Sequence, residues 1–169
     1  MASHRRSVIV SILFVGLGGP AFALAYLPLL ITRFRVPASE PLWQILVAAA
    51  LVIAGATPAL ESMKRFVVVG RGTLVPAVPT ERLVVSGMYR FVRNPMYVGI
   101  LIALAGEVLL FKSLWIAVLA LLIWLGAHLF VCFYEEPTLM RRYGEEYVNF
   151  KRNEPRWLPR LTPWKDGGE

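Results

Sequence analysis

One stretch decides how the chain is organised: Arg90-Phe91-Val92-Arg93-Asn94-Pro95-Met96-Tyr97-Val98-Gly99. It joins a basic, aromatic loop directly to a long apolar run. Pro95 suits the first turn of a helix, where its missing N–H costs nothing, so we predict that a helix begins there. Charged side chains at the mouth of a membrane span are costly unless something polar binds them. The stretch therefore predicts a polar site at the end of an apolar helix.

The helix that begins in this stretch is expected to form half of a hairpin. An apolar run covers residues 95–111, and a second run covers residues 114–134 and ends at Glu135 and Glu136. Only residues 112–113 separate the two runs, and so short a link predicts an antiparallel pair of helices. The end of the second run then returns to the face where the first begins. We therefore expect the two glutamates to meet the opening stretch.

Composition indicates a membrane-embedded chain. Of the 169 residues, 57% are hydrophobic and only 17% are charged, whereas an average soluble domain has roughly 25% charged residues. The mean hydropathy is +0.59. The net charge of +7 favours anionic lipid headgroups as partners, because the basic residues lie beside apolar runs and no motif indicates binding to a nucleic acid. Two His and the single Cys132 supply neither a disulfide framework nor a metal-ligand cluster, so no metal is expected.

Two further apolar runs precede the hairpin. Residues 8–31 are long enough to cross a hydrocarbon core of ~30 Å, although small residues at 21–25 also leave a cleaved signal peptide open. Residues 42–60 are rich in small residues, which suit close helix packing in lipid. We predict an all-α integral membrane protein, a single membrane domain over residues 1–169 with about four transmembrane helices.

The remaining segments are expected to lie at the membrane surface. Residues 61–94 form a basic structured loop, and we expect the preceding helix to continue briefly past Glu61. Residues 135–169 form a tail. Apolar residues recur in the tail every three to four positions, which predicts an amphipathic C-terminal interfacial helix with a break at Gly144; they are Leu139, Tyr143, Tyr147 and Phe150.

The distribution of basic residues predicts the orientation. With four spans, one side collects every Lys and Arg except Arg33, Arg35 and Lys112. Cytoplasmic segments are enriched in these residues. We expect a bacterial inner membrane protein with both termini in the cytoplasm.

Polar residues inside the hairpin have competing interpretations. His128 and Cys132 share a helical face with Glu135 and are expected to line the same cleft, although a single His among apolar residues is more often a packing residue. Glu107 is an intramembrane carboxylate, which is costly without a partner. Its nearness in sequence to Lys112 makes a local polar role compete with a role in the site.

Four motifs in the C-terminal half carry a family resemblance: Ser86-Gly87-Met88-Tyr89-Arg90-Phe91-Val92-Arg93-Asn94-Pro95-Met96-Tyr97-Val98-Gly99, Glu135-Glu136-Pro137-Thr138-Leu139, Tyr143-Gly144-Glu145-Glu146-Tyr147 and Pro155-Arg156-Trp157-Leu158-Pro159. In order and spacing they resemble the isoprenylcysteine carboxyl methyltransferase family and its phospholipid methyltransferase relatives. The resemblance implies an integral membrane enzyme that transfers a methyl group from S-adenosylmethionine to a lipophilic acceptor. The cofactor would bind between the hairpin and the tail.

Carried over by position, the resemblance also implies roles for individual residues. The cofactor pocket would be formed by Gly87, Tyr89, Arg93, Asn94, Tyr97, Gly99, Glu135 and Glu136. The catalytic residues would be Arg93, Glu135 and Arg156, and the substrate would contact His128, Arg156 and Trp157. Asn94 stands where many relatives have His, and Glu154 stands where the family usually has Val, which leaves the acceptor open.

Carboxyl methylation of an isoprenylcysteine-like substrate is the reaction that the resemblance implies. Three alternatives remain: an N-methyltransferase of phospholipids or amines, an NADPH-dependent membrane reductase of the sterol type, and a non-enzymatic membrane scaffold. The expected partners are a lipophilic small-molecule or prenylated substrate and membrane lipids, with neither nucleic acid nor metal.

Overall fold

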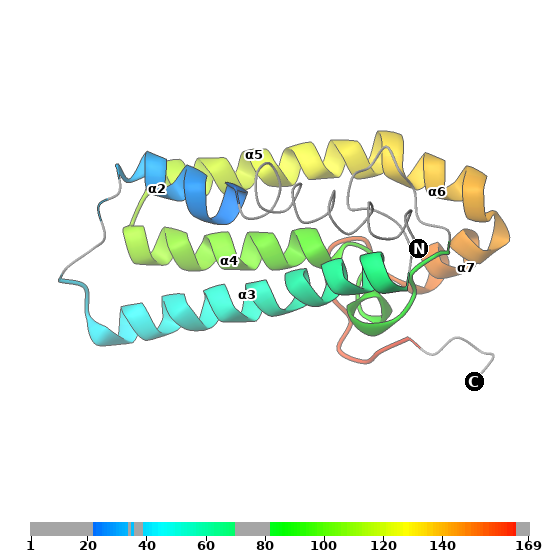
Figure 1. Cartoon of the computed structure of the whole chain (residues 1–169), viewed down its shortest axis with the longest axis horizontal. Helices are drawn as coiled ribbons and strands as arrows, with labels where there is room; N and C mark the ends of the chain where they lie inside the picture. Colours follow the sequence, from blue (N-terminus) through cyan, green and yellow to red (C-terminus); the bar gives the residue numbers. More distant parts are fainter. Residues whose placement is uncertain (1–21, 34, 36–38, 70–81, 165–169) are drawn as a thin grey trace, which may run out of the picture.

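The computed structural model describes residues 22–33, 35, 39–69 and 82–164, and these residues form helices and no strand. The elements in chain order are η2 (Phe22–Tyr26), α2 (Leu27–Ile31), α3 (Leu42–Val68), η3 (Gly87–Arg90), α4 (Pro95–Phe111), α5 (Leu114–Phe130), η4 (Val131–Glu135), α6 (Glu136–Tyr143) and α7 (Glu145–Asn153). Figure 1 shows α3, α4 and α5 running lengthwise beside one another, with α6 and α7 at the end of the bundle where α4 begins.

The predicted hairpin is present. Helix α4 has the bounds expected from the sequence and starts with Pro95 in its first turn. Lys112 adopts the left-handed conformation (φ 47°, ψ 37°) and ends α4, and Ser113 precedes α5. Helices α4 and α5 therefore run antiparallel in contact, and the end of α5 returns toward the start of α4.

Small residues bring α3 and α4 into close contact. A Cβ on Gly55 would collide with the backbone of Gly99 and Ala103, and a Cβ on Gly99 would collide with the backbone of Gly55 and lie 2.9 Å from the Ala59 nitrogen. Such small residues let helix backbones approach where lipid supplies no hydrophobic driving force. The small residues of the second apolar run therefore determine how closely α3 and α4 pack.

Helix α3 continues past the apolar run as expected and ends at Val68. The predicted end of the second hairpin helix was wrong. The second hairpin helix does not stop before the glutamates but continues through the π-helical η4 into α6, which ends at Tyr143. Pro137 removes one backbone donor and crowds the preceding turn, and a π-helical segment widens that turn so that the helix can pass. The glutamates consequently lie within a helix rather than at its end.

Length and composition make two helices candidates for membrane spans, Leu42–Arg65 and Leu114–Tyr143. Pro95–Phe111 and Phe22–Ile31 are apolar but shorter, so the structure confirms the all-helical fold without confirming four spans. Most of the predicted first span, and the alternative signal peptide, lie outside the described residues.

The tail helix breaks where predicted. Gly144 has φ +54° and separates α6 from α7. The apolar residues of α7 do not face outward, however, because Tyr147 and Phe150 are 2% and 3% exposed. This part of the amphipathic face packs against the protein itself.

Candidate active site

The C-terminal segment lies along the stretch that precedes α4. Three backbone hydrogen bonds join them: Arg93 N–H to Pro155 O at 2.9 Å, Arg160 N–H to Phe91 O at 2.8 Å, and Trp164 N–H to Arg90 O at 2.8 Å. The Asn94 side-chain amide adds a bond to the Arg156 carbonyl at 3.1 Å. These bonds hold the Pro155 to Trp157 segment beside the start of α4.

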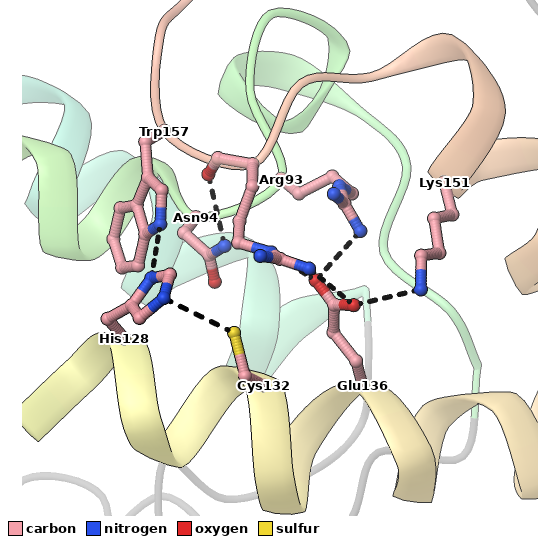
Figure 2. Close-up of polar contacts among 8 residues, drawn as sticks. Arg93, Asn94, His128, Cys132, Glu136, Lys151 and Trp157 are labelled. Atoms are coloured by element: carbon pink, nitrogen blue, oxygen red, sulfur yellow. Dashed lines mark hydrogen bonds and ion pairs between the residues drawn. The ribbon is translucent and has the colours of Figure 1, made fainter.

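Glu136, the first residue of α6, is the centre of an ion cluster. Its three cations come from the stretch before α4, from α7 and from the C-terminal segment. Arg93 Nη1 lies 2.9 Å from Oε1, and Lys151 Nζ from α7 lies 3.0 Å from Oε2. Arg156 donates to both oxygens, from Nε at 2.6 Å and from Nη2 at 3.0 Å. Glu136 is only 6% exposed, so these charge-assisted bonds are partly shielded from solvent. Figure 2 shows the cations converging on this carboxylate from one side of the helix.

The cluster carries three positive charges against the one negative charge of Glu136. Hydrogen bonding to Glu136 raises the pKa of Arg156 above its usual value, against the opposing effect of burial. The guanidinium therefore stays charged, and the surplus of positive charge is suited to an anionic group.

Glu135 differs from its neighbour. Among the described residues, its Oε2 atom is buried and has no hydrogen-bond partner, and the same holds for Nε of Arg93. Burial raises the pKa of Tyr89 above its usual value, and the negative charge of Glu135 adds to that effect. Buried polar atoms are nearly always bonded, so these two atoms are free to bond to a ligand group; Oε2 of Glu107 and Oε2 of Glu154 are likewise buried without a described partner.

An aromatic cluster adjoins the ion cluster. Trp157 Nε1 donates to His128 Nδ1 at 3.1 Å, and Trp124 stacks on the His128 ring with a centroid separation of 5.4 Å. The ring centroids of Tyr97 and Trp157 are 6.3 Å apart. Because Nδ1 accepts, neutral His128 carries its proton on Nε2, which faces Cys132 Sγ at 3.7 Å. The arrangement fits a positioning role for His128.

Residues 43–146 match the phospholipid methyltransferase family. The chain belongs to this family. Because the family includes the isoprenylcysteine carboxyl methyltransferase relatives, the match confirms the resemblance identified from the motifs. No curated protein and no solved structure gives a significant match. This phospholipid methyltransferase family member is therefore a membrane methyltransferase, and members generally use S-adenosylmethionine.

The structure brings together most of the residues that the sequence analysis predicted for the site of this methyltransferase. The ion and aromatic clusters contain Arg93, Asn94, Tyr97, His128, Glu136, Arg156 and Trp157. Glu135 directly precedes Glu136 in the chain, and its charge acts on Tyr89 and on Tyr97. Their roles with cofactor or substrate remain predictions.

Gly87 and Gly99, two of the predicted cofactor residues, each lie in close contact with α3. Gly99 packs against α3, as described above. Gly87 has φ +63° and starts η3, and a Cβ there would collide with the side chains of Glu61 and Arg65. Glu61 also accepts a bond from the Met88 N–H at 3.3 Å. The extension of α3 beyond residue 60 therefore supports the loop that precedes the site.

Glu107 lies away from these clusters. It is 9% exposed, and its Oε2 atom has no partner among the described residues. Lys112 does not pair with it but with Glu40, at 2.5 Å. Neither the local polar role nor the role in the site that the sequence left open for Glu107 has a described contact to support it.

Sequence reasoning missed Lys151 and the contact made by Glu154. Lys151 is one of several basic residues on a surface helix, and no local pattern distinguishes it from Arg152. Glu154 is 2% exposed and bonds to Arg160 at 3.3 Å. The signal in the sequence that could have indicated this contact is the position of Glu154 directly before the Pro155 to Pro159 motif. Among the described residues, no group of His, Cys, Asp and Glu could hold a metal ion.

Proposed function

We propose that this protein transfers a methyl group from S-adenosylmethionine to the carboxylate of an isoprenylcysteine-like lipophilic acceptor. One observation carries the assignment of the donor site: among the described residues, Glu135 Oε2 and Arg93 Nε are buried beside the ion cluster and have no hydrogen-bond partner. The methyl donor bears an ammonium and a carboxylate, which complement these two side chains.

The residues present fit that cofactor. Glu135 would hold the ammonium group or the ribose hydroxyls, and Arg93 would hold the carboxylate. Asn94, Tyr89 and Tyr97 would supply the neighbouring polar and aromatic surface. Glu136 is assigned a supporting role, because its oxygens already accept bonds from three cations. When bound, the cofactor supplies an electrophilic methyl group on a sulfonium.

The chain's own task is then positioning and exclusion of water. A carboxylate acceptor is already a nucleophile, so the reaction needs no general base, and alignment of the reactants supplies several kcal/mol. Arg156 and Trp157 would lie near the acceptor's polar group, and the positive surplus around Glu136 favours an anionic acceptor. The tail bonds to Arg93 and Asn94 would keep water from the site.

A phospholipid or amine acceptor is the second candidate. The rings of Tyr97, Trp124 and Trp157 adjoin the site, and aromatic faces attract ammonium groups. This acceptor must lose a proton before attack, and a carboxylate or a water would have to accept it. Family membership supports either methylation reaction over the reductase and scaffold alternatives.

Ligand titration tests the donor. Isothermal calorimetry on the purified protein is expected to detect S-adenosylhomocysteine and not NADPH. Glu135→Gln should weaken binding at least about tenfold, because a charge-assisted bond contributes ~1.5–3 kcal/mol. Glu146→Gln, at an exposed carboxylate of α7, is the matched control and should bind normally. Binding of NADPH alone would support the reductase alternative and defeat the proposal.

Product analysis tests the acceptor. The protein is incubated with methyl-labelled S-adenosylmethionine and either a prenylcysteine analogue or a lipid extract. A methyl ester releases labelled methanol in base, whereas an N-methyl group is stable. Base-labile label in the prenylcysteine analogue is the expected result. Base-stable label confined to lipid would select the second candidate.

A further inference from the structure

A polar cavity of about 480 Å³, open to solvent, lies at the end of the bundle opposite the candidate active site. Its walls come from the residues after α2, from Glu40 shortly before α3, and from the α4–α5 turn with the adjoining ends of both helices, and they include Thr32, Arg35 and Lys112. Figure 1 shows the α4–α5 turn and the end of α2 at one end of the bundle, and α6 and α7 at the other. The 17 residues of α4 separate the two regions, which is about 25 Å of helix.

The cavity has a positive surplus. Arg35 and Lys112 contribute two cations, and Glu40 contributes the one carboxylate named among the lining residues. Lys112 lies 2.5 Å from Glu40 but its side chain remains 60% exposed, whereas the Glu40 side chain is 17% exposed. Because the Lys112 side chain is already exposed, its ammonium group can turn toward a second anion with little loss of buried surface. Neighbouring Arg33 is also exposed and adds to the positive potential.

An apolar rim flanks the charged groups. Leu114 and Trp115 line the cavity, and both are more than 70% exposed. Trp43, at the start of α3, is also exposed. Tryptophan is enriched where a membrane meets water, and basic side chains near that level contact lipid phosphates. In a membrane protein, the cavity therefore combines an anion-binding centre with a surface for acyl chains.

We propose that this cavity binds the phosphate headgroup of an anionic glycerophospholipid. Arg35 and Lys112 contact the phosphate, and the acyl chains lie over Leu114 and Trp115. The separation from Glu135 and Glu136 makes the bound lipid an accessory molecule and not the methyl acceptor. The proposal is independent of the donor and acceptor assigned above.

Native mass spectrometry of the detergent-purified protein tests the proposal with phosphatidylglycerol, phosphatidylcholine and inorganic phosphate as probes. Phosphatidylglycerol should be retained preferentially, and Arg35→Gln should reduce its retention about fivefold, the effect expected for one basic residue near a lipid surface. Glu40→Gln releases Lys112 and should increase retention, a change that misfolding cannot produce. Arg152→Gln, on α7 at the opposite end, makes the same charge change and should have no effect.

Several outcomes would overturn the proposal. Equal retention of phosphatidylglycerol and phosphatidylcholine would remove the charge preference, and an equal loss in Arg152→Gln would show that only net charge matters. Complete displacement by an equal concentration of inorganic phosphate would show a site for small anions and not for a lipid. A decrease in retention on Glu40→Gln would contradict the assigned role of Lys112.

Discussion

Glu136 and Arg156 are joined by two hydrogen bonds, from Nε to Oε1 at 2.6 Å and from Nη2 to Oε2 at 3.0 Å. The pair connects the continuation of the long hairpin helix to the C-terminal segment. Because Arg93 and Lys151 bond to the same carboxylate, one side chain ties the start of α4, α7 and the tail together. Glu136 is therefore a structural centre of the site.

Glu136→Gln is expected to destabilise the protein. Removing one partner of a buried ion pair leaves uncompensated charge and costs ~3–5 kcal/mol. We expect a lower midpoint of thermal unfolding in detergent by several degrees, measured by circular dichroism. Glu135→Gln, which removes a carboxylate whose Oε2 has no described partner, should leave the midpoint nearly unchanged. Equal losses in both variants would contradict the division of roles.

Gly55→Ala should separate α3 from α4. The added methyl group would collide with the backbone of Gly99 and Ala103, and overpacking of this kind costs about 1–3 kcal/mol. Gly126→Ala is the control, because a Cβ there has no neighbour within 4 Å among the residues that the structure describes and alanine favours the helix by roughly 1 kcal/mol. Thermal unfolding should rank the proteins as Gly126→Ala, wild type, Gly55→Ala. A Gly55→Ala protein as stable as the wild type would refute this close packing.

Stability should depend on pH through Glu154. Burial raises the pKa of this carboxyl above its usual value of 4.5, and the charge and hydrogen bond of Arg160 oppose the rise. For a carboxyl with a raised folded-state pKa, the stability present below the unfolded pKa is lost as the pH rises through the folded pKa. In the wild type, the midpoint of thermal unfolding should therefore fall as the pH rises above about 4.5, and in Glu154→Gln this fall should be smaller.

Arg160→Gln provides the opposite test of the same group. Loss of the partner at 3.3 Å removes an effect that lowers the pKa of Glu154, so the fall in stability should become steeper and extend to higher pH. Unfolding midpoints of the wild type and both variants, measured from pH 4 to pH 8, would check the signs. Parallel curves for all three proteins would exclude Glu154 as a titrating group.

Trp157→Phe should loosen the tail. The substitution keeps an aromatic ring but removes the Nε1 donor to His128, a bond with an expected value of ~0.5–1.5 kcal/mol. Trypsin cleaves after Arg160 only when the segment opens locally, so the cleavage rate is proportional to the open population. Loss of this bond should therefore make cleavage about two- to twelvefold faster. Trp115→Phe, at the opposite end of the bundle, should not change the rate. An unchanged rate in Trp157→Phe would show that this bond does not hold the segment.

Local signals in the sequence were sufficient for much of the helical framework. Pro95 determines the start of α4, because proline fits the first turn and cannot donate from within a helix. The two-residue link at 112–113 leaves only an antiparallel return. Gly144 ends α6 because glycine adopts its positive φ without a Cβ penalty. These features depend on covalent chemistry within a few residues.

Helix continuation was harder to predict from the same signals. Pro137 indicated an end, but η4 carries the helix past it into α6. The sequence indicated that α3 continues briefly past Glu61 but not how far, and in the structure Glu61 and Arg65 pair along α3 and contact the η3 region. Tertiary contacts of this kind override local preference, because they are absent from the helix considered alone.

By itself, the sequence thus determined the helical hairpin, the meeting of its glutamates with the Arg93 stretch, and the family. Only the tertiary structure distinguished Glu136, bonded to three cations, from Glu135, whose Oε2 atom has no partner in the described part of the chain. Likewise, only the tertiary structure showed that Lys151 rather than Arg152 bonds to Glu136, and that Gly99 packs against α3. The physical reason is that adjacent residues of one type have the same local propensities, whereas their partners depend on helix rotation and on segments distant in the chain.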